Sequence, residues 1–486
     1  MSVMFEEAIN SILNDELNKA ELLIKSKPEG FELVLPLLKM VKGKRFPLGK
    51  LRAKTPTLIK ISISYTCSLK CEMCDISFPY NGSIFKDRKS LLPEEFNKLT
   101  PWVEKALQVV FCGEGETLDS PHIFDYLKKL EKKNTSLVTS GVPLNSQKAK
   151  LLIDSKLNFL HFSFDGKTSA GHGAGKENYI RNFWRKVKNI QELKKKRNSK
   201  IPFLGLQVSV NAENINSLDE LLETAYKHDV REVMLIPMFG HREVLLKKTI
   251  YKNYEKSRGK INSIMSKWNK RGINLTVMNQ HKRMHNFINP CFFVDNLIEF
   301  RTQLDLPFIC CNTLTMPMKF NGSSVSKYFN SFPFRYLRHL HFCPDAGDLP
   351  NICQTCWVVS IKQYYEARLD DLRQGGNHDA HVLYSKASLL KKNNCLNKSK
   401  KTFMKVLELK PDSSLMGKAY FHLGEISIME KKYKEALSLM KLAVHHCFDH
   451  KKAFVYLYLL LMLLEDNNIL KRKKKAYFNY FKLRRQ

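Results

Sequence analysis

Three cysteines on one short stretch constrain the chain most strongly. Cys67, Cys71 and Cys74 follow one another with the spacing C-x3-C-x2-C. They come directly after Leu58–Tyr65, in which apolar and polar residues alternate, and this period of two predicts a strand. The cysteines are therefore expected on the loop that leaves the carboxyl end of that strand. Three thiolates can hold three irons of a [4Fe-4S] cluster and leave the fourth iron open to a small molecule.

Two other roles are open to these cysteines, a zinc knuckle and a chance stripe on a helix. Zinc would require a fourth Cys or His close by in the sequence. Neither residue occurs between Cys74 and Cys112. The spacing therefore favours an iron–sulfur cluster over both alternatives.

Strand-like and helix-like segments alternate from residue 57 to about residue 284. The candidate strands are Leu58–Tyr65, Gln108–Phe111, Ser136–Thr139, Phe159–Phe164, Phe203–Val210 and Glu232–Pro237. The amphipathic segments between them are Pro121–Lys133, Gln147–Asp154, Tyr179–Arg197 and Leu218–His228. Such alternation predicts an α/β domain built from parallel βα units. Residues at the carboxyl ends of the strands are then the candidates for a binding site.

The cysteine triplet resembles the signature of the radical S-adenosylmethionine (SAM) enzymes, in which an apolar residue such as Met73 often precedes the last cysteine. The resemblance implies a partial (β/α)6 barrel over residues 58–284, because six units are too few to close a barrel of eight strands. It also implies a [4Fe-4S] cluster at the triplet, whose open iron binds S-adenosyl-L-methionine. One electron then splits SAM, and the resulting 5'-deoxyadenosyl radical abstracts a hydrogen from the substrate.

Short motifs after the later strands resemble the elements with which this family binds SAM. The matching residues are Gly113, Gly115 and Glu116 after the second strand, Thr139 after the third, Ser163 and Asp165 after the fourth, and Arg181 on the following helix. A carboxylate such as Glu116 can accept hydrogen bonds from the ammonium group of SAM. A surface ion pair is an equal alternative for Arg181. Asn211 and Asn214 are placed near SAM in this picture, and a role as turn residues is an equal alternative for them.

A second group of cysteines lies in residues 285–366. Four of them are enough to hold a second [4Fe-4S] cluster, and the predicted ligands are Cys291, Cys310, Cys353 and Cys356. Cys311 could take the place of Cys310, Cys343 could replace one of the four, and a zinc ribbon is the alternative for the whole group. The segment resembles the SPASM or twitch extensions of radical SAM enzymes, which implies one auxiliary cluster beside the substrate.

Both ends of the chain show the apolar spacing of helices. Residues 1–57 predict a helical extension that packs or docks against the rest of the protein. Residues 377–486 contain positions that recur after 37 residues, as Phe403 and Met440 do. These offsets resemble tetratricopeptide (TPR) repeats, which implies stacked helical hairpins that hold a peptide or a partner protein.

The chain is strongly basic, with 80 Lys and Arg against 47 Asp and Glu and a net charge of +33. Such a charge suits nucleic-acid binding, but the lysines are spread over the chain, as a compositional bias would also produce. Twelve cysteines without a signal peptide indicate a reducing cytoplasm rather than disulfides. The most apolar run, Ala453–Leu464, is too short to span a bilayer, so no membrane partner is expected.

The sequence therefore predicts a radical SAM oxidoreductase or maturase that acts on a peptide or protein side chain. An electron donor such as flavodoxin or ferredoxin is the further partner that this chemistry implies. The alternatives are a radical SAM enzyme that modifies RNA, tRNA or a small molecule, and a non-catalytic iron–sulfur protein whose repeats bind partners. The residues select neither the substrate nor the outcome of the reaction.

Overall fold

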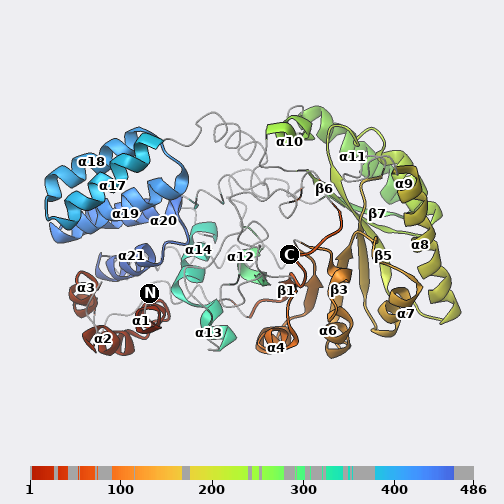
Figure 1. The fold of residues 1–486 in the computed structure, drawn as a ribbon, viewed down its shortest axis with the longest axis horizontal. Coiled ribbons are helices and arrows are strands. Elements are labelled where there is room, and N and C mark those ends of the chain that lie inside the picture. The colour runs from red at the N-terminus through yellow and green to blue at the C-terminus, as the bar shows by residue number, and fades with distance from the viewer. Residues whose placement is uncertain are drawn as a thin grey trace. The chain divides into compact units, whose positions relative to one another are not determined.

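The chain forms two compact units, which Figure 1 draws as ribbons. The first unit combines Met1–Pro56, Lys282–Asn296 and Asp305–Gln486, and the second combines Thr57–His281 with Leu297–Leu304. The structure, a computed structural model, describes residues 3–26, 31–41, 53, 55–69, 71, 74, 90–113, 115–166, 176–238, 243–250, 254–277, 291, 293–300, 307, 320, 324–342, 349–350, 353 and 378–464.

The second unit is an α/β domain built on one sheet of eight parallel strands. In spatial order the strands are β7, β6, β5, β4, β3, β2, β1 and β8. Their bounds are β1 Leu58–Ile61, β2 Gln108–Phe111, β3 Asn134–Thr139, β4 Phe159–Ser163, β5 Phe203–Val210, β6 Glu232–Pro237, β7 Asn274–Val277 and β8 Leu297–Phe300. The α/β class and the six predicted strands are confirmed. The expected total of six strands is wrong, because β7 and β8 extend the sheet at its two edges.

Strand β8 returns to the sheet from the segment that the sequence assigns to the cysteine-rich region. It pairs in parallel with β1, and Lys60 Nζ lies 3.0 Å from Oε2 of the fully buried Glu299. All four residues of β8 are buried, so the strand lacks the alternation that would have revealed it. Because of this pairing, Leu297–Leu304 groups with the sheet rather than with the remainder of 285–366.

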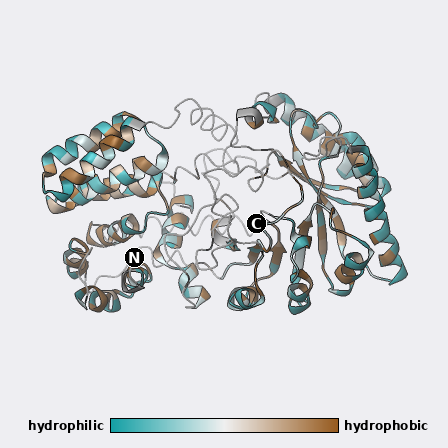
Figure 2. Ribbon diagram, in the orientation of Figure 1, coloured by the Kyte–Doolittle hydropathy of each residue, from teal (hydrophilic) through white to brown (hydrophobic). Residues whose placement is uncertain are grey.

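Helices cover one face of the sheet (Figure 1). Their bounds are α4 Pro93–Asn97, α5 Thr100–Val103, α6 Ile123–Lys129, α7 Ser146–Asp154, α8 Lys176–Lys196, α9 Leu218–Lys227, α10 Glu243–Lys248 and α11 Tyr254–Lys270, with the short 3-10 helix η1 Thr117–Asp119. Phe162 of β4 meets Phe183 of α8 edge-on, with ring centroids 5.3 Å apart. Trp102 of α5 meets Phe300 of β8 at 5.5 Å. Figure 2 shows the result, hydrophobic strands behind helices whose outer faces are hydrophilic.

The opposite face of the sheet is half-exposed. Along β1, β2, β4 and β6, buried residues alternate with more exposed ones. Leu160 and Phe162 point to the helices, so His161 and Ser163 point to the other face, where Ser163 pairs with Gln207 of β5. Closed barrels of eight strands fill this side with packed layers of side chains. The open sheet therefore leaves a half-exposed face on which a ligand can bind.

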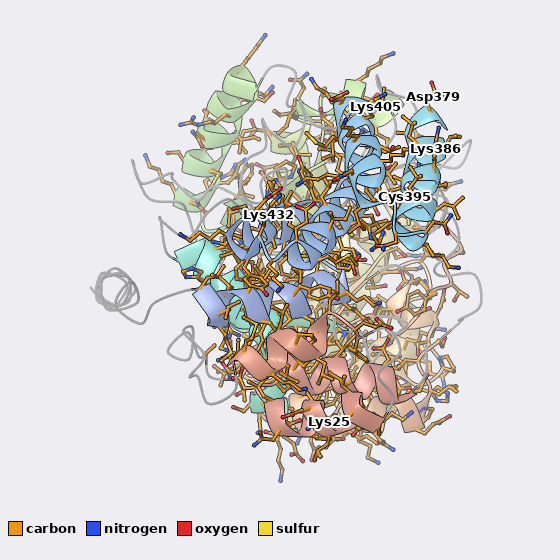
Figure 3. All side chains as sticks on the ribbon, turned by 90° about the vertical axis from the view of Figure 1, so that its left-hand side faces the viewer. Lys25, Asp379, Lys386, Cys395, Lys405 and Lys432 are labelled. Atoms are coloured by element: carbon orange, nitrogen blue, oxygen red, sulfur yellow. The ribbon has the colours of Figure 1, made fainter. Side chains whose placement is uncertain are left out.

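Four helices of the first unit form two similar hairpins. They are α17 His378–Lys392, α18 Leu396–Glu408, α19 Ser413–Met429 and α20 Tyr433–His446. Helices α17 and α19 end 37 residues apart, and α18 and α20 begin 37 residues apart. The matched pairs Phe403 and Met440, and Ser399 and Ala436, are all fully buried. Figure 3 shows the side chains that cover the outer surface, among them Lys386.

Helix α21, Lys451–Leu464, forms the centre of the first unit. Its residues Ala453–Met462 are all buried, against α20 on one side and the N-terminal helices on the other. Those helices are α1 Val3–Leu13, α2 Leu17–Ser26 and α3 Val34–Val41, of which α1 and α3 pack on α21. The Tyr458 hydroxyl donates to Asp15 Oδ1 at 2.9 Å. None of the helices that the structure describes is long and apolar enough to cross a membrane.

The structure describes three further helices of this unit, α12 Phe293–Asn296, α13 Val325–Phe329 and α14 Phe332–Phe342. Helix α14 carries two fully buried arginines. Arg335 Nη2 donates to Asp15 Oδ2 at 2.6 Å, and the Arg338 guanidinium lies 4.5 Å above the ring of Phe329. Phe332 meets Tyr458 of α21 with ring centroids 5.1 Å apart. Helix α14 is therefore a core element of the first unit.

Candidate functional site

The loop that leaves the carboxyl end of β1 carries the cysteine triplet. Cys67, Cys71 and Cys74 are half-buried. The backbone N–H of Cys74 donates to the Cys71 carbonyl at 3.0 Å, which forms a turn between the two. Burial, together with the charges of the neighbouring Cys74 and Cys67, raises the pKa of the Cys71 thiol to about 12. A bound metal centre would reverse this effect, because it favours the thiolate form.

The donor set fits an iron–sulfur cluster. Three thiolates on one loop supply the soft ligands that iron–sulfur clusters require and leave one iron without a protein ligand. Within the part of the chain that the structure describes, however, no three Cys, His, Asp or Glu side chains gather closely enough to form a finished metal site. The ligand set Cys67, Cys71 and Cys74 therefore stays a prediction.

The glycine-rich turn after β2 packs directly on the cysteine loop. The backbone N–H of Glu116 donates to the carbonyl of Thr66 at 2.8 Å. A Cβ on Gly115 would lie 2.3 Å from the carbonyl oxygen of Ser64, and a Cβ on Gly113 would lie 1.8 Å from a serine hydroxyl just after β1. Both separations are shorter than any van der Waals contact, so the turn reaches this loop only because it lacks side chains at these positions.

The carboxylate of Glu116 is buried and accepts four hydrogen bonds. The donors are the Leu118 N–H at 3.0 Å, the Thr139 hydroxyl at 2.5 Å, and the N–H and hydroxyl of Ser140 at 2.8 and 2.5 Å. These bonds join the turn after β2 to the turn after β3. The predicted SAM contacts of Glu116 and Thr139 stay predictions. Ser140, which follows Thr139 directly in the same predicted turn, completes this network.

Asp165 is buried just beyond β4. Its Oδ1 accepts a 2.6 Å hydrogen bond from the N–H of Ser209 in β5. Burial raises the pKa of Asp165 to about 7, although the Ser209 bond opposes the shift. Ser163, two residues earlier, is exposed at the end of β4. Both residues therefore lie at the strand ends where parallel sheets bind ligands.

Arg181 does not join the other predicted residues. It lies on an exposed side of α8, two residues after Tyr179, whose hydroxyl donates to the Ser140 carbonyl at 3.5 Å. Among the described residues, no ion pair involves Arg181. The surface ion pair therefore has no partner in the described part of the chain, and the contact to the SAM carboxylate stays a prediction.

Asn211 and Asn214 are turn residues. Asn214 Oδ1 accepts from the Asn211 N–H at 2.8 Å, and Asn211 Oδ1 accepts from the Asn214 N–H at 2.9 Å. The Asn214 amide also donates to the Ser209 carbonyl at 2.7 Å. Both side chains are buried and occupied within their own turn, which favours the structural alternative.

Two of the four predicted auxiliary ligands are described. Cys291 and Cys353 are half-buried, whereas Cys310 and Cys356, like the alternatives Cys311 and Cys343, lie outside the described residues. The backbone N–H of Cys291 donates to His341 Nδ1 of α14 at 3.4 Å. Burial lowers the pKa of His341 to about 4. No sequence pattern points to His341, because it lies in a helical run outside the cysteine motifs.

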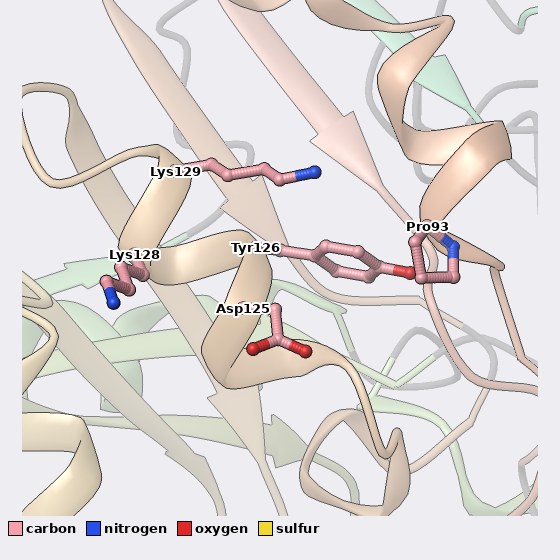
Figure 4. A pocket seen from close by; sticks show the side chains of 5 residues that line it. All are labelled: Pro93, Asp125, Tyr126, Lys128 and Lys129. Atoms are coloured by element: carbon pink, nitrogen blue, oxygen red, sulfur yellow. The ribbon is translucent and has the colours of Figure 1, made fainter.

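A pocket of about 450 Å³ lies elsewhere, on the helices that cover the sheet (Figure 4). Its lining residues are Pro93 of α4 and Asp125, Tyr126, Lys128 and Lys129 of α6. The Tyr126 hydroxyl donates to the Leu91 carbonyl at 2.6 Å, and its ring stacks on Phe96 at 4.2 Å. Tyr126 therefore serves the packing of α4 on α6. None of the predicted SAM or cluster residues lines this pocket.

Comparison with known proteins identifies the domain that carries the cysteine triplet. Residues 61–235 match the sequence profile of the Radical SAM superfamily. The predicted radical SAM domain is therefore confirmed for this stretch, and members of that superfamily are enzymes that use a [4Fe-4S] cluster and SAM. No curated protein sequence matches the chain.

Two solved structures resemble the chain at a distance. SuiB from Streptococcus suis, bound to S-adenosylmethionine, is 13% identical with a TM-score of 0.45, over 64% of this chain and 72% of its own. The protein anSMEcpe with bound AdoMet is 16% identical with a TM-score of 0.45, over 63% of this chain and 85% of its own. Both likenesses are too remote to bear on the substrate of this chain.

Proposed function

We propose that this protein is a radical SAM enzyme that cleaves S-adenosylmethionine reductively and abstracts hydrogen from a peptide or protein side chain. The observation that carries the proposal is the packing of the turn after β2 on the cysteine loop after β1. Gly115 approaches the loop backbone, and the Glu116 N–H bonds to Thr66, beside the first cysteine. The two motifs that the family uses for the cluster and for SAM thus lie against each other.

Cys67, Cys71 and Cys74 would hold the first cluster, which would supply the electron for SAM cleavage when a flavodoxin or ferredoxin reduces it. Gly113, Gly115 and Glu116 would shape the edge of the SAM site. Thr139 and Ser163 end the neighbouring strands β3 and β4, and Asp165 lies just beyond β4. All three would offer hydrogen bonds to SAM from the same edge of the sheet.

Glu116 would act on SAM through its position. Its four hydrogen bonds fix the turns after β2 and β3 relative to the cysteine loop. A carboxylate that accepts four bonds has used about as many lone-pair sites as it has. Glu116 would therefore attract the ammonium group of SAM mainly through its negative charge, because few of its lone pairs remain free to accept a hydrogen bond.

The peptide or protein substrate is inferred from the helical hairpins of the first unit. The hairpins α17–α18 and α19–α20 repeat at an offset of 37 residues, with matched buried positions. Repeated helical hairpins form extended surfaces that bind peptides and partner proteins. We assign these hairpins a TPR-like role in holding the substrate, and Cys291, Cys310, Cys353 and Cys356 to one auxiliary [4Fe-4S] cluster.

The iron content of the reconstituted protein tests both cluster assignments. Intact protein should bind about eight irons per chain, four for each [4Fe-4S] cluster. The triple variant with Cys67, Cys71 and Cys74 changed to Ala should keep about four irons, and further changing Cys291 to Ala should lower this number. Bound zinc, or an iron content that the triple variant does not reduce, would contradict the assignment.

A further inference from the structure

We propose that His341 donates a hydrogen bond from Nε2 to a sulfur atom of the auxiliary iron–sulfur cluster that Cys291 helps to hold. The inference rests on the proposed function, which supplies the cluster. It adds a residue that no cysteine spacing identifies, and it gives that residue a definite task, the tuning of the cluster's reduction potential.

The hydrogen bond to Nδ1 of His341 determines that the proton of the neutral ring lies on Nε2. His341 is 1% exposed, and its Nδ1 accepts from the backbone N–H of Cys291. A ring nitrogen that accepts a hydrogen bond carries no proton, so the neutral imidazole must carry its proton on Nε2. The ring therefore presents an N–H donor on the side away from the Cys291 backbone.

This donor has no acceptor among the residues that the structure describes. His341 Nε2 is buried and makes no hydrogen bond there. A buried N–H without an acceptor is costly, and such groups are rare in folded proteins. An acceptor is therefore expected at Nε2. The ring already contacts a predicted cluster ligand, and thiolate or sulfide sulfur of a cluster is an acceptor of the right chemistry.

The rest of α14 supports a specific task for this nitrogen. The helix is anchored through other side chains, since Arg335 bonds to Asp15 and Arg338 bonds to the Phe329 carbonyl. His341 is not needed for those contacts. Hydrogen bonds to cluster sulfur raise the reduction potential, because they stabilise the more negative reduced state. His341 is thus placed to make the auxiliary cluster easier to reduce.

Two substitutions separate the roles of the two ring nitrogens. His341→Asn places an amide oxygen near the position of Nδ1, so it can still accept from Cys291 but has no donor at the far position. His341→Gln reaches the position of Nε2 with an amide N–H. His381→Asn, on the exposed side of α17, is the matched control. Each variant is made in the full chain that already has Cys67, Cys71 and Cys74 changed to Ala, so that the auxiliary cluster is the one observed.

The measurement is a redox titration of the cluster followed by electron paramagnetic resonance, with iron content and circular dichroism as checks. His341→Asn should lower the ratio of reduced to oxidised cluster at a fixed potential about tenfold, which is about 59 mV for a one-electron couple. His341→Gln should recover most of this loss, and His381→Asn should match the parent.

The outcomes distinguish this inference from the proposed function. Absence of iron from the parent variant would overturn the auxiliary cluster and the inference together. A cluster whose potential is the same in the parent and in His341→Asn would overturn the inference alone. Loss of iron from His341→Asn with an unchanged fold would also overturn it, because the ring would then be required to hold the cluster.

Discussion

The carboxylate of Glu116 accepts four hydrogen bonds at the candidate site. It is buried and draws its donors from η1 and from the turn after β3, while its own backbone N–H bonds to the cysteine loop. Removal of one partner from a buried charged hydrogen bond leaves the others unsatisfied. The residue therefore holds together three turns that must keep their relative positions if SAM and a cluster are to meet.

Replacement of Glu116 by Ala should destabilise the protein by about 3 kcal/mol, because the four donors lose their acceptor in a buried site. Asp119→Ala, a change to an exposed carboxylate in the same turn, should cost less than about 0.5 kcal/mol. Urea unfolding followed by circular dichroism measures both. Equal losses for the two variants would show that the network around Glu116 contributes nothing to stability.

Replacement of Gly115 by Ala should weaken cluster binding, because the new Cβ would lie 2.3 Å from a backbone oxygen of the cysteine loop. Overpacking of this kind costs about 1–3 kcal/mol when the loop must move. Gly259→Ala is the control, since nothing lies within 4 Å of that Cβ in α11 and Ala favours helix by about 0.5–1 kcal/mol. Iron retained after reconstitution should fall for Gly115→Ala only. Full retention in that variant would mean that the turn does not need its close approach.

At the scale of elements, strands with alternating apolar residues could be predicted and uniformly buried or short ones could not. The bounds of β2, β5 and β6 agree with the predicted ranges to the residue. Strand β8 was missed because all four of its residues are buried, and β7 because its four residues alternate too briefly to register. The site residues follow the same division. Positions on strand ends could be placed from sequence, whereas His341 depends on a tertiary contact to Cys291 that no spacing encodes.

The start of helix α21 makes the stability of the protein depend on pH. His450 precedes this helix, and its Nδ1 accepts from the Ala453 N–H at 3.2 Å. Burial lowers the pKa of His450 to about 4, below its unfolded value of 6.5. The unfolded chain therefore binds the proton first as the pH falls. Stability should be complete above about pH 6.5 and should decrease as the pH falls toward 4.

His450→Asn should flatten this dependence, because an amide oxygen can still accept from Ala453 but does not titrate. Between pH 7 and pH 4 the parent should lose about 3 kcal/mol more than the variant, as an upper figure for a shift of this size. Urea unfolding at the two pH values gives the difference. If both proteins lose the same free energy of unfolding between pH 7 and pH 4, groups other than His450 cause the acid sensitivity.

In the whole molecule, the predicted catalytic domain and the predicted substrate-binding helices lie in different units. The second unit holds the radical SAM domain, and the first holds the hairpins, the N-terminal helices and the described auxiliary cysteines. Helix α21 is packed by α1 and α3, so deletion of residues 377–486 would uncover the apolar faces of those N-terminal helices. Partner binding is therefore best measured with the intact chain.

The net charge of +33 bears on how tightly the whole protein binds tRNA. If the charge is compositional, binding to tRNA at physiological salt should be no tighter than the non-specific range of about 10⁻⁴–10⁻⁶ M. Fluorescence anisotropy with labelled tRNA over a series of salt concentrations measures this. Nanomolar binding that is specific for one tRNA would favour the RNA-modifying alternative over a peptide or protein substrate.

Cleavage of SAM by the purified protein decides whether this protein is a radical SAM enzyme. Reconstituted protein, reduced with dithionite under anaerobic conditions and supplied with SAM, is assayed for 5'-deoxyadenosine by liquid chromatography. Slow formation of 5'-deoxyadenosine and methionine is expected even without substrate, and none is expected from the variant with Cys67, Cys71 and Cys74 changed to Ala. Failure of the intact protein to form any 5'-deoxyadenosine while it carries about eight irons per chain would contradict the claim that this is a radical SAM enzyme.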